Sequence, residues 1–173
     1  RSVSRGLGDV YKRQVLKEAD LILTTGGVSV GDKDLVPDVI ESLNGRVLFH
    51  GIRVKPGMPT MLSVVEDIPV LSLSGNPFAV AALFELLAGG YLADRAEEVY
   101  IQKKETKVLR QTFVKTGKPK RIVKGKCDEE GVFLPQIQRN GQLKNGIGSN
   151  CLVVFPEGER TYPEGEKVQV IRI

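Results

Sequence analysis

The sequence predicts an α/β protein whose first half alternates strands with helices and whose second half is built from strands. Between residues 15 and 97, short apolar runs typical of buried strands alternate with segments of helical periodicity. After Tyr100, short charged strands follow one another between turns rich in Gly and Pro. We therefore expect an α/β domain over residues 15–97 and a small β-barrel or sandwich over residues 98–173.

The first strand and helix of the α/β domain have clear signals. Residues 15–20 are typical of the last turns of a helix, and residues 21–25 (LILTT) are an apolar run short enough for a buried parallel strand. Segment 34–45 spaces its apolar residues at helical intervals, tolerates Pro37 in its first turn and stops at an Asn-Gly pair. We expect a strand, a glycine-rich loop and a helix, in that order.

The rest of this domain continues the alternation. Residues 46–54 (RVLFHGIRV) predict one strand, and the stiff Lys-Pro-Gly-Met-Pro loop of residues 55–59 follows it. Strands are expected at 60–65 and 68–74, around a two-residue turn. A long apolar helix is expected from residue 77, because an Asn-Pro pair supplies a good N-cap and a favoured first helical residue.

Composition is that of an ordinary soluble globular protein, with 41% apolar and 27% charged residues in a chain of 173. The longest apolar run, Phe78–Ala93, is interrupted by Glu85 and a Gly-Gly pair. It falls short of the roughly 20 apolar residues that span a bilayer, so we expect a buried helix. The absence of a signal-peptide pattern and the presence of only two cysteines favour the cytoplasm and disfavour a membrane protein.

Residues 1–14 (RSVSRGLGDVYKRQ) fit none of these patterns. They are polar and basic, have no clear period, and resemble translated adapter sequence at the end of an assembled sequence. We expect them to be a non-native lead, which would make the chain an N-terminally truncated fragment. A native flexible leader is the alternative.

Charge is divided unevenly between the two halves. Residues 1–97 hold 10 basic and 12 acidic residues, whereas residues 98–173 hold 15 and 9, so the net charges are −2 and +6. The basic half favours an anionic partner, with a solvated basic surface as the alternative. Nucleic acid is disfavoured, because this half has no Trp and few aromatic side chains on which bases could stack.

Glycines and carboxylates follow the first predicted strand. Gly26 and Gly27 come directly after it, and Ser29, Asp32 and Asp34 follow within a few residues. Ligands of parallel sheets bind beyond the carboxyl ends of the strands, where glycine lets backbone N–H groups approach a phosphate. Carboxylates beside a phosphate most often hold a hydrated Mg²⁺. The alternative is a tight turn before a helix whose dipole favours aspartate.

Two further strand ends carry groups suited to anions. Arg53 and Lys55 lie two residues apart on one side of a predicted strand, just before the Pro-Gly-Met-Pro loop. Ser74, Gly75 and Asn76 precede the apolar helix, whose dipole and free N–H groups favour an anion. Exposed basic residues and simple helix capping are the alternatives. Three such features at strand ends favour anion binding more strongly together than singly.

Three residues of types common in catalytic and metal sites are expected to be structural. His50 is the only histidine, and it lies within a predicted strand. Cys127 and Cys151 are far from it in the sequence, which disfavours a zinc site. We expect the histidine to be a packed or surface residue and both cysteines to lie in the core.

Three motifs in this order, TTGGVSVGDKD, VKPGMP and SGNP, closely resemble those of one family. With the β-rich second half, residues 15–173 resemble the molybdopterin molybdotransferases, the MoeA and gephyrin E-domain family. The resemblance implies the carboxyl-terminal part of a MogA-like three-layer αβα domain with a mostly parallel sheet, followed by a β-barrel domain. The first motif alone is shared with MogA-like adenylyltransferases.

The resemblance also implies an activity. Members of the family insert molybdate into adenylylated molybdopterin, while the adenylyl bond is hydrolysed with a divalent cation, usually Mg²⁺, and AMP leaves. The family's whole chain has further N-terminal domains and forms a homodimer with its cleft between subunits. We therefore expect the 173 residues alone to be inactive.

Site residues transfer from the family by motif position. Asp34 matches the acidic residue that handles metal and phosphate, Ser29 the serine of its motif, and Lys55 the lysine that holds phosphate or molybdate. Asp34 and Lys55 are the expected catalytic residues, and Asp34 is the expected Mg²⁺ ligand. The other expected binding residues are Gly26, Gly27, Gly31, Asp32, Arg53, Pro56, Gly57, Gly75, Asn76, Pro77 and Lys124.

Four positions depart from the family pattern. Met58 replaces the second lysine of the loop, Ala79 replaces a serine after the Asn-Pro pair, Lys124 stands for an arginine, and residues 138–140 (QRN) stand for a Gln-Gly-Ser turn. Lysine lacks the bidentate fork of arginine. These departures weaken the molybdate-holding role more than the nucleotide-handling one. A non-catalytic molybdopterin-binding or sensor module and a MogA-like adenylyltransferase stay open as alternatives.

Overall fold

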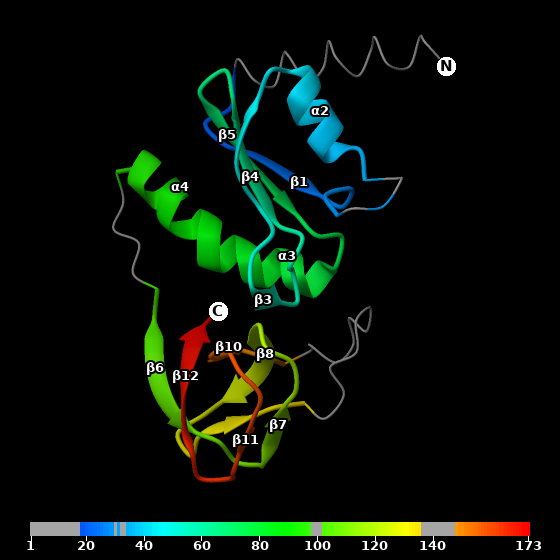
Figure 1. Cartoon of the computed structure of the whole chain (residues 1–173). Helices are drawn as coiled ribbons and strands as arrows, with labels where there is room; N and C mark the ends of the chain where they lie inside the picture. Colours follow the sequence, from blue (N-terminus) through cyan, green and yellow to red (C-terminus); the bar gives the residue numbers. More distant parts are fainter. Residues whose placement is uncertain (1–17, 30, 32–33, 98–101, 136–147) are drawn as a thin grey trace. The chain divides into compact units, whose positions relative to one another are not determined.

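A computed structural model describes residues 18–29, 31, 34–97, 102–135 and 148–173 (Figure 1). Contacts group the chain into two compact units: unit 1 (Arg1–Ile52 and Pro59–Gly75) and unit 2 (Arg53–Met58 and Asn76–Ile173). Sheets with a few helices make a mixed α/β fold, as the sequence predicts. Because the two units interleave along the chain, the domain boundary between residues 97 and 98 stays a prediction.

Unit 1 is built on a four-stranded sheet in the order β1-β5-β4-β2. Its strands are β1 (Ile22–Thr25), β2 (Arg46–His50), β4 (Met61–Val65) and β5 (Ile68–Leu73). β1 pairs with β5 in parallel, whereas β4 pairs with both β5 and β2 antiparallel. The expected mostly parallel sheet is therefore wrong for the described strands, which form a mixed sheet with one parallel pair.

A two-residue hairpin explains this mixed sheet. Glu66 and Asp67 have φ values of 49° and 66°, the left-handed backbone of a tight hairpin turn. Such a turn brings the chain back beside itself, so β4 and β5 run antiparallel. The sequence predicts both strands and their turn, and the direction of the pairing follows from the length of that turn.

Helix α2 (Val36–Ser42) packs on the sheet of unit 1. Pro37 lies in its first turn, and the chain leaves the helix through Asn44, whose φ is 55°, so the predicted stop is confirmed. The core of unit 1 comprises Val28, Ile40, Met61, Val65 and Val70, with Ile22, Val36, Leu43 and Ile68 partly buried against it. The cluster includes Val28, so the loop that follows β1 is anchored in the core.

The predicted strand 46–54 is divided in the structure. β2 ends at His50, Gly51 adopts a φ of 98°, and Val54–Lys55 form a separate short strand, β3. β3 pairs in parallel with a strand of unit 2 and does not extend the sheet of unit 1. Glycine takes this left-handed conformation at little cost, and the chain bends there. The prediction of a single strand is therefore wrong.

One long helix opens the second part of unit 2, in three segments: α3 (Pro77–Leu83), the π-helical turn η1 (Phe84–Ala88) and α4 (Gly89–Arg95). Asn76 Oδ1 accepts hydrogen bonds from the N–H groups of Phe78 and Ala79, at 3.0 and 3.1 Å, which confirms the predicted N-cap.

The same helix is apolar enough to cross a bilayer by length and composition, and only 22% of its apolar window is buried. The prediction of a buried helix is therefore wrong in part, because a run that is apolar on all sides does not indicate which side is covered. The buried residues are Ala79, Ala82, Leu83 and Ala88. The exposed large residues are Phe84, Leu87, Tyr91 and Leu92.

The strands of unit 2 form a sheet in the order β3-β8-β10-β12-β6, with β9 beside β8 and a separate β7–β11 pair. These strands are β6 (Lys104–Val108), β7 (Phe113–Lys115), β8 (Lys120–Cys127), β9 (Val132–Phe133), β10 (Cys151–Phe155), β11 (Arg160–Tyr162) and β12 (Lys167–Arg172). Among the described strand pairs of this unit, β3–β8 is parallel and the others are antiparallel. The strand-rich second half is confirmed, and its closure into a barrel stays a prediction.

An aromatic group lies in the core of unit 2. Phe155 is fully buried, with its ring centroid 4.5 Å from that of Phe113 and 4.7 Å from that of Tyr162. Cys127 and Cys151 lie in the same core as free thiols, as the sequence predicts. Burial raises the pKa of the Cys151 thiol to about 12.

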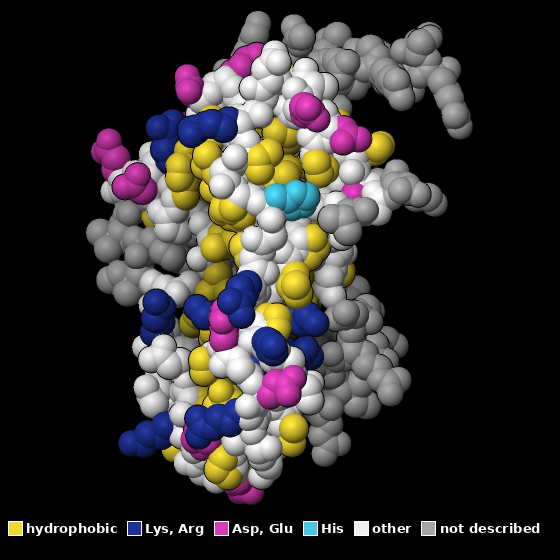
Figure 2. All heavy atoms as spheres, in the orientation of Figure 1, with side chains coloured by type: hydrophobic (Ala, Val, Ile, Leu, Met, Phe, Trp, Pro, Cys, Tyr) yellow, Lys and Arg dark blue, Asp and Glu magenta, His cyan; other side chains and the backbone are white. Residues whose placement is uncertain are grey.

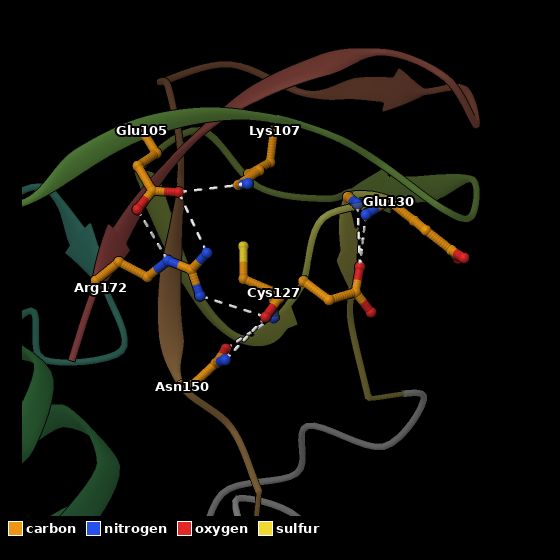
Figure 3. A network of polar contacts seen from close by, with 8 residues as sticks. Glu105, Lys107, Cys127, Glu130, Asn150 and Arg172 are labelled. Atoms are coloured by element: carbon orange, nitrogen blue, oxygen red, sulfur yellow. Dashed lines mark hydrogen bonds and ion pairs between the residues drawn. The ribbon is translucent and has the colours of Figure 1, made fainter.

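A polar network joins strands β6, β8 and β12 (Figure 3). The Arg172 guanidinium donates to both carboxylate oxygens of Glu105, from Nε at 3.0 Å and from Nη2 at 3.2 Å. Its Nη1 donates to the Cys127 carbonyl at 3.3 Å, and Asn150 exchanges two hydrogen bonds with the Cys127 backbone. Lys107 adds an ion pair to Glu105 at 3.5 Å. The hydrogen bonds from Arg172 hold the pKa of Glu105 below its usual value.

Replacing Phe155 by Ala should strongly destabilise unit 2. Truncation of a buried aromatic ring costs about 3–5 kcal/mol. Phe133→Ala is the matched control, because that ring is 44% exposed, and it should cost no more than about 1 kcal/mol. Urea unfolding measures both variants, and equal losses would contradict the assigned core.

Replacing Glu105 by Gln should remove a pH-dependent part of the stability. The folded-state pKa of Glu105 is lowered, so its ion pair stabilises the fold above the unfolded pKa of about 4.5 and is lost as the pH falls through the folded value. The wild-type advantage in urea midpoint should be constant near neutral pH and shrink below about pH 5. Glu164→Gln, at an exposed glutamate without an ion pair among the described residues, should show no such trend. A difference that does not change with pH would contradict the ion pair.

Candidate anion-binding site

The carboxyl ends of β1 and β5 lie side by side in unit 1 (Figure 1). The Gly26 N–H donates to the Leu73 carbonyl at 2.9 Å, which carries the pairing one residue past β1. Gly75 follows so closely that a Cβ on it would lie 3.5 Å from the Gly26 Cα. The parallel pairing therefore brings the Gly-Gly loop and the Ser-Gly-Asn turn together, as ligand binding beyond the ends of parallel strands requires.

The loop after β1 is held from two sides. Gly26 and Gly27 have φ values of 80° and 67°, which glycine adopts without strain. Val28 is buried in the core, and its carbonyl accepts a hydrogen bond from His50 Nε2 at 2.7 Å. His50 is thus a structural residue that supports the glycine loop, a contact that the sequence did not indicate. Ser29, the next residue, is exposed.

Asp34 closes a short turn with Gly31. Its Oδ2 accepts from the Gly31 N–H at 2.9 Å, and its own N–H donates to the Gly31 carbonyl at 2.8 Å. The Val36 N–H donates to the Gly27 carbonyl at 3.0 Å, which ties the start of α2 to the glycine loop. The Asp34 carboxylate is therefore oriented by its own turn and stays partly exposed. Asp32 lies outside the described residues.

Asp34 supplies the described carboxylate of this turn. Over the described parts of the chain, no three His, Cys, Asp or Glu side chains are grouped closely enough to hold a metal ion. Magnesium at phosphate sites uses one or two carboxylates and completes its shell with water and phosphate oxygens. Asp34 therefore fits a Mg²⁺ ion that is held jointly with a phosphate-bearing ligand.

The Lys-Pro-Gly-Met-Pro loop is fixed on helix α3. Lys55 is exposed at the end of β3, and Gly57, two residues on, is buried with a φ of 106°. A Cβ on Gly57 would overlap Leu83 Cδ1 and lie 3.5 Å from the Ala79 Cβ. Ala79 is fully buried, whereas Met58 is 42% exposed. Of these two departures from the family pattern, Ala79 is thus a packing residue and Met58 faces solvent.

Arg53 is already paired within unit 2. Its Nη2 lies 3.2 Å from Glu157 Oε2, and both side chains are exposed. The loop of Glu157 is held by Lys115, a buried lysine whose Nζ donates to the carbonyls of Gly117, at 2.8 Å, and Gly158. An anion that binds Arg53 must therefore compete with a carboxylate on a well-anchored loop.

The other expected residues of unit 2 are engaged in local contacts. Asn76 caps α3, so the capping interpretation holds for its side chain, and Pro77 opens the helix. The Lys55–Pro56 bond is cis. Lys124 Nζ lies 4.7 Å from the ring centroid of Phe78, a cation–π contact. On the face shown in Figure 2, more lysine and arginine side chains lie over unit 2 than over unit 1, in agreement with the basic second half.

Comparison with known proteins identifies the family. The family described as "Probable molybdopterin binding domain" matches residues 7–94. The chain belongs to this family. The match begins inside segment 1–14, whose foreign origin stays a prediction, and that segment lies outside the described residues.

Curated relatives extend the likeness over most of the chain. The molybdopterin molybdenumtransferases of Staphylococcus aureus (strain COL) and Bacillus subtilis (strain 168) are 32% and 31% identical over 91% and 93% of the chain, which is 40% and 39% of their own length. The crystal structure of a molybdopterin biosynthesis MoeA protein from Pyrococcus horikosii has a TM-score of 0.77 and 27% identity, over 92% of this chain and 39% of that one. The resemblance predicted from three motifs is confirmed, and the chain spans about two fifths of these relatives.

Three buried hydroxyl groups lie near the carboxyl ends of β1 and β5, an arrangement that the sequence did not indicate. Thr24 Oγ1, Ser72 Oγ and Ser74 Oγ are buried and accept or donate no hydrogen bond within the described part of the chain. Thr24 and Ser72 are direct neighbours on β1 and β5, and Ser74 follows two residues later. Buried hydroxyls normally have partners. These three make the carboxyl end of the sheet more polar than its core, which fits a polar ligand there.

Replacing Gly57 by Ala should destabilise the fold by about 2–4 kcal/mol, because overpacking against Leu83 adds to the strain of a left-handed residue. Gly117→Ala is the matched control, since its φ is 85° but nothing lies within 4 Å of its Cβ, and it should cost only about 1 kcal/mol. The double variant Gly57→Ala with Leu83→Ala should lose less stability than the two single variants combined, because the smaller side chain at position 83 removes the overlap. Urea unfolding measures these losses, and equal effects at both glycines would contradict the close packing.

Proposed function

We propose that this chain is part of a molybdopterin molybdotransferase, which inserts molybdate into adenylylated molybdopterin and releases AMP. The observation that carries the proposal is the meeting of the Gly-Gly loop and the Ser-Gly-Asn turn at the ends of two parallel strands, beside the oriented carboxylate of Asp34. The names of the relatives support the same reaction. Because the chain spans about two fifths of those relatives, the reaction is proposed for the whole protein.

Each part of the site has a proposed role. The N–H groups of the Gly26–Gly27 loop bind phosphate oxygens of the substrate, since glycine lets the backbone come close. Asp34 holds Mg²⁺ together with the adenylyl phosphate, and the bound ion supplies charge neutralisation at that phosphate. Lys55 binds molybdate or phosphate through its exposed ammonium group. In the hydrolysis, a water oxygen bonds to the adenylyl phosphorus as the phosphoanhydride bond breaks, with the phosphate of molybdopterin as the leaving group. The water loses a proton to the solvent, and AMP is released.

The wider setting belongs to the same proposal. Ser29, Gly31, Asp32, Gly75 and the Asn76–Pro77 turn surround the nucleotide and pterin phosphates, and Arg53, Pro56, Gly57 and Lys124 serve the anionic end. The whole protein is proposed to be a cytoplasmic homodimer with a three-layer αβα domain and a β-barrel domain.

A non-catalytic molybdopterin-binding module is the second candidate. The observation that favours it is the loss of two polar groups, because Met58 is exposed where the family pattern has lysine and Ala79 is buried where it has serine. Such a module would bind adenylylated molybdopterin and release no AMP on addition of molybdate. A MogA-like adenylyltransferase would instead form the adenylylated compound from ATP and molybdopterin.

Molybdate-dependent AMP release by the native gene product that contains this chain tests the proposal. Asp34→Asn should lower the rate by about 100-fold, because the amide can still accept from Gly31 but carries no charge for the metal. Asp38→Asn, in the first turn of α2, is the matched control and should keep the wild-type rate. Binding without AMP release would support the module, ATP-dependent adenylylation would support the adenylyltransferase, and a normal rate in Asp34→Asn would contradict the role of Asp34.

A further inference from the structure

We propose that Arg121 and Lys55 together form one oxyanion site at the paired strands β3 and β8. Nothing in the sequence motifs singles out Arg121. The inference rests on the proposed function, in which anionic groups bind at Lys55, and it adds a second cation to that site. The ligand class is a tetrahedral dianion, either molybdate or a phosphate group.

Strand pairing places the two cations together. In the parallel β3–β8 pair, Lys55 lies directly opposite Arg121, and Val54 lies opposite Lys120. The Lys120 N–H donates to the Arg53 carbonyl at 2.9 Å, so the pairing is hydrogen-bonded at its start. Directly opposite residues point to the same face of a sheet with their Cβ atoms about 5 Å apart. One small dianion can therefore contact both side chains.

Two like charges therefore lie opposite each other at this position. Like charges directly opposite each other destabilise a sheet. Arg53 is neutralised by Glu157, but neither Lys55 nor Arg121 forms an ion pair with the described residues. A bound dianion would offset this repulsion, and guanidinium adds a planar fork that matches oxyanion geometry.

Both side chains start from well-held backbone. Arg121 lies opposite the buried Phe155 of β10 and is itself partly buried, so its stem is supported by the core. Lys55 is held through the buried Gly57, two residues on. Such support lowers the entropic cost of binding.

Lys124 does not share this face. The register of β8 with β10 is continuous from Arg121 to Gly125, so side chains alternate between the two faces without a bulge. Lys124 is three positions from Arg121, lies opposite Leu152 and has its ammonium over the ring of Phe78. Arg121 is therefore the cation of β8 that accompanies Lys55.

Calorimetric titration of the 173-residue chain with sodium molybdate, and separately with inorganic phosphate, tests the site. Arg121→Gln and Lys55→Met should each weaken binding of the preferred anion by about tenfold or more, the loss of one charged hydrogen bond. The double variant should bind little more weakly than either single variant, because the two cations share one anion. Lys126→Gln is the matched control, an exposed lysine of the same strand on the opposite face, and should bind as the wild type does.

Thermal unfolding supplies a readout that a purely structural role would not produce. Without anion, Arg121→Gln should be at least as stable as the wild type, since one of two like charges is gone, and it should lose the anion-induced rise in Tm.

Tighter binding of molybdate than of phosphate would identify the metal oxyanion as the ligand, and the reverse would identify a substrate phosphate. Wild-type affinity in Arg121→Gln, or no binding by the wild type, would overturn this inference while leaving the AMP-release test unaffected. If the native gene product released no AMP, but the 173-residue chain bound the anion and Arg121→Gln did not, the proposed function would be rejected and this inference would stand.

Discussion

The packing of Gly57 against Leu83 is the contact on which the cationic part of the site depends. It joins the loop after β3 to helix α3, and it leaves no room for a side chain at the glycine. Through this contact, Lys55 extends from a fixed backbone on edge strand β3, opposite Arg121 on the neighbouring strand β8. The buried Ala79 belongs to the same packing, so its small side chain has a structural use in this chain.

The glycine loop depends on a different constraint, the parallel pairing of β1 with β5. The pairing places the ends of both strands at one edge and brings Gly26 beside Gly75. The loop after β1 is then held by the side chain of Val28, which is buried in the core, and by the hydrogen bond from His50 to the Val28 carbonyl. The Asp34 carboxylate is oriented by the hydrogen bond from Gly31 within its own turn, so its orientation depends on no distant residue.

The lysine and arginine side chains of unit 2 differ in the contacts that their charged groups make. Lys115 is buried and serves the backbone of two loops, Arg53 is paired with a carboxylate, and Lys124 lies over an aromatic ring. An anion that binds Arg53 or Lys124 must therefore share or displace an existing contact. Lys55 and Arg121 have no ion-pair partner in the described part of the chain, and the local charge there favours an added anion.

The sequence by itself determined most of the strands, the N-cap of α3, the hairpin turn and the family, because these follow from local periodicity, turn chemistry and three short motifs. It also indicated Gly26, Gly75 and Lys55, which lie at strand ends. Only the tertiary structure decided that β3 leaves the first sheet at Gly51 and pairs with β8, and that Arg121 therefore stands opposite Lys55. That pairing joins segments more than sixty residues apart, and its register depends on long-range packing that no local pattern encodes.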